Sequence, residues 1–187
     1  MSGADWIHED VALQPGRYNR SLLDAEASAR RFTEGGGAGV VLRFAGFYGP
    51  DSDQLPEMAA AVRRGWMPLV GAAESYVSSV SHDDAARAVV AVLDVPAGVY
   101  NVVDDEPLTH RAFADALADA LGVPHPRLPP AWLAHVTGSL GELFSRSVRM
   151  SNRKLRDAAG WAPVYPSARE GLRYSGAMTS SPEPVRA

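Results

Sequence analysis

Two arginines in the segment FSRSVRM, Arg146 and Arg149, have the chemistry to recognise an anion. A guanidinium group forms bidentate hydrogen bonds with a phosphate. The segment lies between two predicted helices, and loops commonly carry binding residues. We therefore take both as candidate contacts to a phosphorylated substrate, with a solvated surface as the alternative. The nearby cations Arg153, Lys154 and Arg156 are expected on the exposed face of a short helix.

The glycine-rich run Gly35–Gly39 has the composition of a phosphate-binding loop but not its context. A dinucleotide fingerprint places glycine at the first, third and sixth positions between a strand and a helix. Here the run follows a predicted helix and the sixth position is Val40, so a helix end and a turn are expected. No two histidines are three or four residues apart, and HExxH and GxSxG are absent, so we predict no metal site. His82, Asp83 and Asp84 are expected at a solvated helix start.

The composition is that of a globular chain. Its 187 residues are 46% hydrophobic, and Lys+Arg 18 against Asp+Glu 22 gives a net charge of -4. Dispersed basic residues argue against nucleic-acid binding, and the absence of cysteine excludes disulfides and thiolate zinc sites. The acidic amino terminus has no apolar stretch, and Arg43 and Asp94 interrupt the longest apolar runs, so neither a secretory signal nor a membrane span is predicted. We expect a soluble, cytoplasmic protein.

The elements that must position these residues follow an α/β pattern. Apolar spacing predicts a helix over 19–34, and Gly39–Phe44 is a β-branched run typical of a strand buried on both faces. Further helices are expected at 55–64, at 84–94 with Ser81 or Asp83 as cap, and at 110–121 between Thr109 and Gly122, with strands at 76–80 and 99–103. Short helices are expected near 131–144, 152–159 and 167–174, with Ser151 and Ser167 as caps. Two or three strands are few for an independent sheet, so the list indicates part of a larger α/β domain.

Five ordered motifs resemble the extended short-chain dehydrogenase/reductases, the NAD-dependent epimerase/dehydratase group. The segment YNRSLLDAE resembles the family's Tyr-x-x-Ser-Lys-x-x-x-Glu, and LRFAGFYGP resembles its Leu-Arg-Pro-x-Asn-x-Tyr-Gly-Pro. SVSHDDAARAV, GVYNVVDDEPLT and KLRDAAGWAP with SAREGL continue the resemblance through about residues 16–174. The positions in register with the first two motifs are Tyr18, Ser21, Glu26, Leu42, Arg43, Tyr48, Gly49 and Pro50.

The resemblance implies the carboxyl-terminal part of a Rossmann-type parallel sheet with a small, mostly helical substrate lobe, and without the cofactor-binding half. The expected organisation is an irregular lead-in at 1–17, late Rossmann-type strands and helices at 18–122, a helical substrate lobe at 123–174 and a disordered tail at 175–187. NAD or NADP is the implied cofactor, although the family's Gly-rich loop is missing here. Pairing of two copies through the Tyr18 helix is the implied assembly, and no nucleic acid or membrane partner is expected.

The resemblance also implies the site residues. Tyr18 occupies the position of the catalytic acid/base and Ser21 that of its helper. Leu22 stands where the family has the lysine that lowers the phenol pKa and holds the nicotinamide ribose, and leucine can do neither. Tyr18 therefore has two interpretations, an acid/base in an altered site or an aromatic residue kept for packing.

The strand end that follows is the implied border of the nicotinamide. Phe44, Ala45, Gly46 and Tyr48 are the predicted cofactor contacts, with Arg43 and Tyr48 also expected to maintain this strand end. Phe44 and Gly46 replace the family's proline and asparagine. Val77 lies near the place of an arginine that often binds the nucleotide-sugar phosphate.

These sites imply an NAD(P)-dependent epimerase, dehydratase or reductase acting on a sugar or related carbinol, active as part of a longer chain or assembly. The alternative is a non-catalytic pseudoenzyme or interaction module that has lost the dinucleotide-binding half and the lysine. A truncated product without a role of its own is a third possibility, and it would aggregate through unpaired strand edges.

Overall fold

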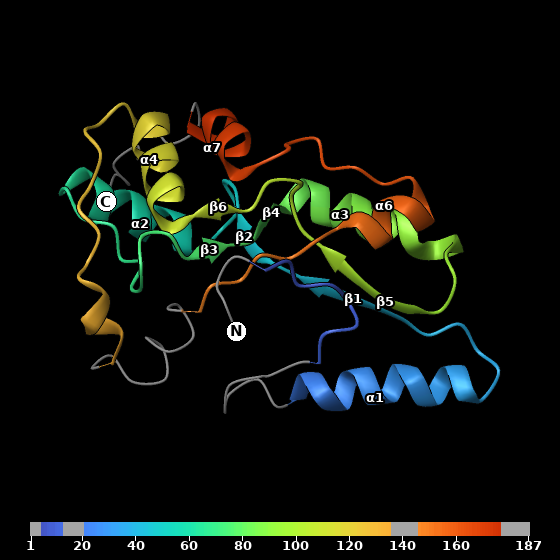
Figure 1. Ribbon diagram of the computed structural model, residues 1–187. Coiled ribbons are helices and arrows are strands. Elements are labelled where there is room, and N and C mark those ends of the chain that lie inside the picture. The colour runs from blue at the N-terminus through green and yellow to red at the C-terminus, as the bar shows by residue number, and fades with distance from the viewer. Residues whose placement is uncertain (1–4, 13–20, 136–145, 177–187) are drawn as a thin grey trace, which may run out of the picture.

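The computed structural model describes residues 5–12, 21–135 and 146–176. Helices and strands are mixed along this part of the chain (Figure 1). The α-helices are α1 (Ser21–Glu34), α2 (Gln54–Arg63), α3 (His82–Ala91), α4 (His110–Leu121), α6 (Arg153–Ala159) and α7 (Ala168–Gly176), with 3-10 helices η2 (Val92–Asp94) and η3 (Ala131–His135). The strands are β1 (Val40–Phe44), β2 (Gly46–Tyr48), β3 (Tyr76–Val77), β4 (Ser79–Ser81), β5 (Gly98–Val102) and β6 (Leu108–Thr109). The predicted α/β class is confirmed.

The strands form three two-stranded sheets among the described residues. β1 pairs with β5 and β2 with β4, both in parallel, whereas β3 pairs with β6 in antiparallel orientation. The β1–β5 register runs from Val40 opposite Gly98 to Phe44 opposite Val102. The prediction that this first strand is buried on both faces is wrong, since its first four residues are half-buried and Phe44 is exposed. The cause is that β1 has β5 on one edge only and that α1 buries none of its own residues against it.

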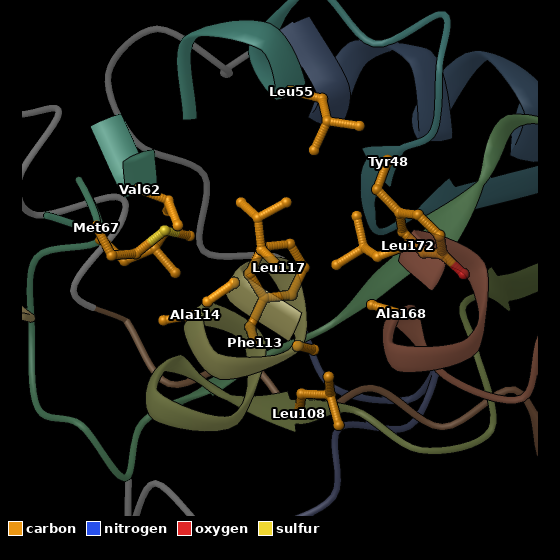
Figure 2. Close-up of a cluster of buried hydrophobic side chains, with 13 residues drawn as sticks. Tyr48, Leu55, Val62, Met67, Leu108, Phe113, Ala114, Leu117, Ala168 and Leu172 are labelled. Atoms are coloured by element: carbon orange, nitrogen blue, oxygen red, sulfur yellow. The ribbon is translucent and has the colours of Figure 1, made fainter. Parts of the chain in front are cut away.

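Two hydrophobic cores lie on either side of the short β2–β4 pair. The sheet core joins α3 and β5 to Leu155 and Trp161, which are 0% and 5% exposed. The lobe core joins α4 to α2 and α7, with Phe113 and Leu117 at its centre (Figure 2). Figure 1 shows α1 on one side of the β1–β5 pair and α3 with α6 on the other. The carboxyl end of the parallel pair, where a ligand of an open α/β sheet binds, is thus flanked by both cores.

Helix ends follow the local chemistry of their caps. Thr109 caps α4 by accepting a 3.1 Å hydrogen bond from the Ala112 amide, and Gly122 ends it in a left-handed conformation at φ 65. Ser81, one of two predicted caps, begins α3 by accepting from the Asp84 amide. For α6 the flanking residue is Asn152 rather than Ser151.

Several predictions fall on residues outside the described part. They concern Tyr18, residues 136–144 of the helix expected near 131–144, whose first five residues form η3, and the tail beyond Gly176. The first two residues of that expected tail, 175 and 176, belong to α7. The proposed domain boundaries stay predictions. In the described residues no helix has the length and apolar character needed to cross a membrane.

Candidate functional site

The predicted cofactor border lies where β1 gives way to β2. Ala45 is half-buried there, and its amide donates to the Val102 carbonyl at 3.1 Å, while the Gly46 amide donates to the Ser78 carbonyl at 3.2 Å. The backbone is thereby attached to a neighbouring strand on each side. Phe44 remains 37% exposed and lies 5.5 Å, between ring centroids, from Phe47. This strand end therefore presents an exposed aromatic side chain close to the exposed Gly46.

Tyr48 points into the protein instead of lining that surface. It is 2% exposed and packs in the lobe core with Ala168 and Leu172 (Figure 2). Its hydroxyl donates a long, 3.5 Å hydrogen bond to the Ser167 carbonyl of the α7 start. Burial, with Asp104 as the next cause, raises the pKa of the phenol above its ordinary value. Tyr48 therefore joins β2 to α7 as a neutral group, the structural role also expected for it.

Asp104, two residues after the end of β5, is a buried acid that the sequence reasoning missed. It is 1% exposed; its amide donates to the Ser79 carbonyl at 2.8 Å and its Oδ2 accepts from the Ser79 hydroxyl at 3.3 Å. Burial raises the pKa of Asp104 to about 8, and the hydroxyls of Tyr48 and Ser79 partly oppose that rise. The carboxyl group is thus largely protonated at neutral pH. The signal in the sequence was an acidic pair, Asp104 and Asp105, directly after a buried strand.

Asp84 is a second buried acid, and it corrects the expectation of a solvated helix start at His82–Asp84. Its side chain is 0% exposed and accepts from the amides of Val164 at 2.7 Å and Tyr165 at 3.3 Å. It also accepts from the Ser81 hydroxyl at 2.9 Å. The carboxylate therefore fixes the segment before α7 against the start of α3. Among the described residues, no group of three or more acidic or histidine side chains is arranged to hold a metal ion.

Arg43 joins β1 to α1 and to the segment that contains Glu9 and Val11. Its Nε and Nη2 donate to the two carboxylate oxygens of Glu26 at 2.7 and 3.1 Å, so β1 holds α1 through a bidentate ion pair. Its Nη1 donates to the carbonyls of Glu9 and Val11 at 3.2 Å each. Residues 9 and 11 of the predicted irregular lead-in are thereby tied to β1. Ser21 is exposed at the start of the same helix, and Leu22 beside it is 48% exposed.

Of the two predicted substrate-binding arginines, Arg149 is held in a stack and Arg146 is exposed. The Arg149 guanidinium lies 4.1 Å from the centroid of the Trp6 ring and 4.6 Å from that of Tyr76. Such stacking fixes the plane of the guanidinium group. Trp6 also borders a cleft of about 280 Å³ whose other walls are Asp105, Ser151, Asn152, Arg153, Arg156 and Asp157.

The cations of α6 are exposed, as expected, and two of them also contact the rest of the fold. Arg156 forms a 2.7 Å ion pair with Asp105. Lys154 donates to the Val99 carbonyl at 2.8 Å and lies over the Tyr100 ring. Arg153 is 83% exposed and forms a loose ion pair with Asp157 at 3.6 Å.

A comparison with curated proteins gives one informative relative. A 3-diazoavenalumate denitrifying reductase from Streptomyces sp is 35% identical over 142 residues, which are 72% of this chain and 46% of the reductase. The chain therefore spans about half the length of that relative. No protein-family model matches the chain.

Solved structures share the fold over nearly the whole chain. A human epimerase family protein, solved with NADPH, aligns with a TM-score of 0.78 and 18% identity, over 94% of this chain and 61% of its own. The dTDP-glucose 4,6-dehydratase of Bacillus anthracis, solved with NAD, aligns at 0.74 with 18% identity over 95% of this chain and 56% of its own. This chain therefore has the fold of the extended short-chain dehydrogenase/reductases, the NAD-dependent epimerases and dehydratases, over about six tenths of their length.

Proposed function

We propose that the chain is the carboxyl-terminal part of an NAD(P)-dependent enzyme of the epimerase, dehydratase or reductase type, acting on a sugar or related carbinol. It works together with a dinucleotide-binding half in a longer polypeptide or an assembly. The observation that carries the proposal is the open strand end at Phe44–Gly46, which lies at the carboxyl end of a parallel pair. The relative at 35% identity is a reductase, and the fold's solved representatives include proteins with NAD or NADPH bound.

Phe44, Ala45 and Gly46 are the residues that would border the nicotinamide ring. The exposed Phe44 ring offers a flat apolar surface, and Gly46 adds no side chain between this surface and the ring. When bound, the cofactor supplies hydride transfer. Tyr48, with its enclosed phenol, acts by holding this strand end against α7.

Tyr18 is the proposed acid/base, and it precedes the first residue of α1 by three positions. The Glu26–Arg43 ion pair fixes α1 against β1, and Ser21 stands at the start of that helix as the helper. Leu22 supplies no cation for the phenol or for a ribose. A positive charge at the site must therefore come from elsewhere in the complete protein.

Arg149, and Arg146 beside it, are the proposed contacts to an anionic part of the substrate. Stacking between Trp6 and Tyr76 limits the rotation of the Arg149 guanidinium and so reduces the entropy lost when it binds an anion. Two copies of the complete protein would pair through the Tyr18 helix.

The second candidate function is a non-catalytic module. Leucine at position 22 favours it, because it removes the cation that this reaction type uses at that position. On this view the chain keeps the scaffold of the fold and recognises a partner or a ligand without turnover.

A turnover test separates the two. The chain is joined to the part of the Streptomyces reductase that it does not span, and NADPH oxidation is followed with carbonyl substrates. We expect turnover in the parent and a loss of at least about 100-fold in Tyr18→Phe, the range ascribed to a general acid/base. Activity that appears only after Leu22→Lys would mark the parent as a pseudoenzyme.

Cofactor binding gives a readout that needs no substrate. A ligand that binds only the folded state raises stability by RT ln(1 + [L]/Kd), about 2.7 kcal/mol at a hundredfold excess over Kd. In the joined protein we expect the urea midpoint, followed by tryptophan fluorescence, to rise with NAD+ or NADP+. A midpoint that neither cofactor moves would favour the non-catalytic module.

A further inference from the structure

A groove of about 530 Å³ lies between α3 and the segment at the end of α6. Most of the residues that line it are small, namely Ala86, Ala91, Ala159, Gly160 and Ala162. Trp161 lines it as well and is only 5% exposed, because it belongs to the sheet core. Small side chains on both walls leave space for a larger apolar side chain from another body.

Large apolar side chains protrude from the same face of α3. Val90 is 68% exposed, and Leu93, in η2, is 76% exposed. Ala86, Val90 and Leu93 follow the i, i+4, i+7 spacing, so they form one stripe along the helix. Ala86 and Val90 also line the groove, so the protruding side chains and the groove share one surface. A surface with both features is complementary to itself, as a twofold interface between two copies requires.

This surface lies over β5, away from α1. Figure 1 shows α3 and α6 on one side of the β1–β5 pair and α1 on the other. On the side of β5 that faces away from β1, Lys154 donates to the Val99 carbonyl at 2.8 Å, and the Asn101 amide donates to the Glu9 carboxylate at 2.9 Å. Side chains along an edge prevent a further strand from pairing there, so strands that extend the sheet join it at β1. The groove is therefore not the surface that such strands cover.

Two charged residues identify the occupant of the groove. Arg87 lines the groove with a side chain that is 55% exposed and forms a long, 3.8 Å ion pair with Asp84, and Asp94 is exposed at the end of η2. Arg87 and Asp94 are seven residues apart, so they lie on one flank of the apolar stripe. When two copies of α3 pack antiparallel about a twofold axis near Val90, Arg87 of each copy faces Asp94 of the other. Opposite charges across an interface determine its partner and its orientation.

We propose that this surface, here called the α3 face and made of Ala86, Arg87, Val90, Leu93 and Asp94, binds a second copy of the chain. In the pair, α3 packs antiparallel against α3, and Leu93 of each copy enters the groove of the other. Arg87 and Asp94 form two ion pairs across the axis. The α3 face is distinct from the pairing proposed for the Tyr18 helix, since α1 lies on the other side of the β1–β5 pair.

Cysteine cross-linking tests the position of the axis. The chain contains no cysteine, so Val90→Cys introduces a single thiol. Val89→Cys is the matched control, because Val89 is 47% exposed on the same helix and its side chain is turned by about 100° from that of Val90. Under mild oxidation we expect the covalent dimer to form at least about 10-fold faster in Val90→Cys, since the two thiols face each other across the axis within reach of a disulfide.

Charge reversal tests the orientation of the pair. In sedimentation equilibrium of the chain, Arg87→Glu and Asp94→Lys should each raise the dissociation constant of the dimer at least about 10-fold, because like charges then meet twice. An equimolar mixture of the two variants should restore dimerisation, since each changed residue then faces an opposite charge. A folding defect cannot produce that restoration. Asp157→Lys, at a 72% exposed position of α6 outside the groove, is the control and should leave the dissociation constant unchanged.

The protein joined to a dinucleotide-binding half gives a second readout. Pairing through the Tyr18 helix and pairing through the α3 face use different twofold axes, so together they predict a tetramer. Arg87→Glu should convert this tetramer to a dimer. Thermal melting checks that each variant folds. If Arg87→Glu does not fold, Asp94→Lys and the cross-linking rates decide the matter.

Three results would overturn the proposal. They are equal cross-linking rates at positions 89 and 90, charge reversals that leave the dissociation constant unchanged or are not restored by mixing, and a chain that stays monomeric at every concentration at which it is soluble. A dimer that is lost in Leu23→Gln and kept in the α3 variants would also overturn it, because self-association would then belong to α1. NAD(P) binding and turnover are measured separately, so failure of the α3 face leaves the proposed function standing, and the reverse also holds.

Discussion

Helices α4 and α1 have similar lengths, 12 and 14 residues, and very different surroundings. α4 buries six residues against α2, α7 and the strands beneath, among them Phe113 and Leu117. α1 buries none, and the Glu26–Arg43 ion pair joins it to β1. Apolar packing holds α4, whereas the ion pair between Glu26 and Arg43, here called the charged clamp, holds α1. The difference teaches that apolar packing alone fixes the position of α4, whereas α1 keeps apolar side chains such as Leu22 and Leu23 exposed.

The largest effect is expected where packing is complete. Leu117, at 2% exposure in the centre of the lobe core, loses its contacts in Leu117→Ala, and the cavity cannot collapse between three helices. We expect the free energy of unfolding to fall by about 2–5 kcal/mol. Urea titration followed by tryptophan fluorescence measures it. A loss below about 1 kcal/mol would show that the lobe core repacks around the smaller side chain, and that α4 is not held by rigid packing.

The next effect concerns the buried acid between the two cores. Asp104 has its pKa raised to about 8 from 3.8, so the folded protein holds a proton that the unfolded chain releases across that range. Its contribution to stability is complete below the unfolded pKa and is lost as the pH rises through about 8. At up to about 1.4 kcal/mol per pH unit, the parent should lose about 2 kcal/mol between pH 6 and pH 8 relative to Asp104→Asn.

Unfolding titrations at pH 6, 7 and 8 measure this difference. Asp157→Asn serves as the control, because that side chain is 72% exposed and its loss should leave the pH profile of the parent unchanged. Parallel stability curves for the parent and Asp104→Asn would mean that water reaches Asp104 and that the lobe and the sheet are not sealed against each other.

Local chemistry allowed α4 to be predicted to the residue, because a threonine cap and a left-handed glycine mark its two ends. The strand expected at 76–80 is instead split into β3 and β4. Ser78 interrupts it, since its hydroxyl donates to the Val148 carbonyl and accepts from the Met150 amide, groups about 70 residues away in the sequence. Asp104 escaped prediction for the same reason. An acid after a strand is ordinarily solvated, and only the tertiary fold encloses this one.

The candidate site was predictable where it depends on motif register. Glu26 and Arg43 were expected from their motifs, and they form the ion pair that fixes α1. The stack of Arg149 between Trp6 and Tyr76 was not predictable, because it joins three segments through contacts that have no periodicity. Sequence patterns located the elements, and long-range contacts set the environment of each functional group.

A smaller effect is expected at the charged clamp. Arg43→Lys replaces a fork that reaches both Glu26 oxygens and two carbonyls with a single ammonium group. Arg43 and Glu26 side chains are 13% and 23% exposed, so some of the lost bonds are not replaced by water. We expect a loss of about 1–2 kcal/mol in urea titrations. Arg153→Lys, at an ion pair whose arginine is 83% exposed, should change stability by less than about 0.5 kcal/mol. Equal losses in the two variants would show that the Arg43–Glu26 ion pair stabilises the chain no more than an exposed pair does.

The smallest effect is expected on α1 itself, and it sharpens the comparison most. Leu23 is 44% exposed, so Leu23→Gln should change the stability of the chain alone by less than about 0.5 kcal/mol. In the protein joined to a dinucleotide-binding half, where two copies are proposed to pair through this helix, the same substitution places an amide in a covered apolar surface, and a loss of about 1–3 kcal/mol is expected. Urea midpoints of both forms give the two values. A full loss already in the chain alone would mean that α1 is packed without any partner, and the contrast with α4 would then disappear.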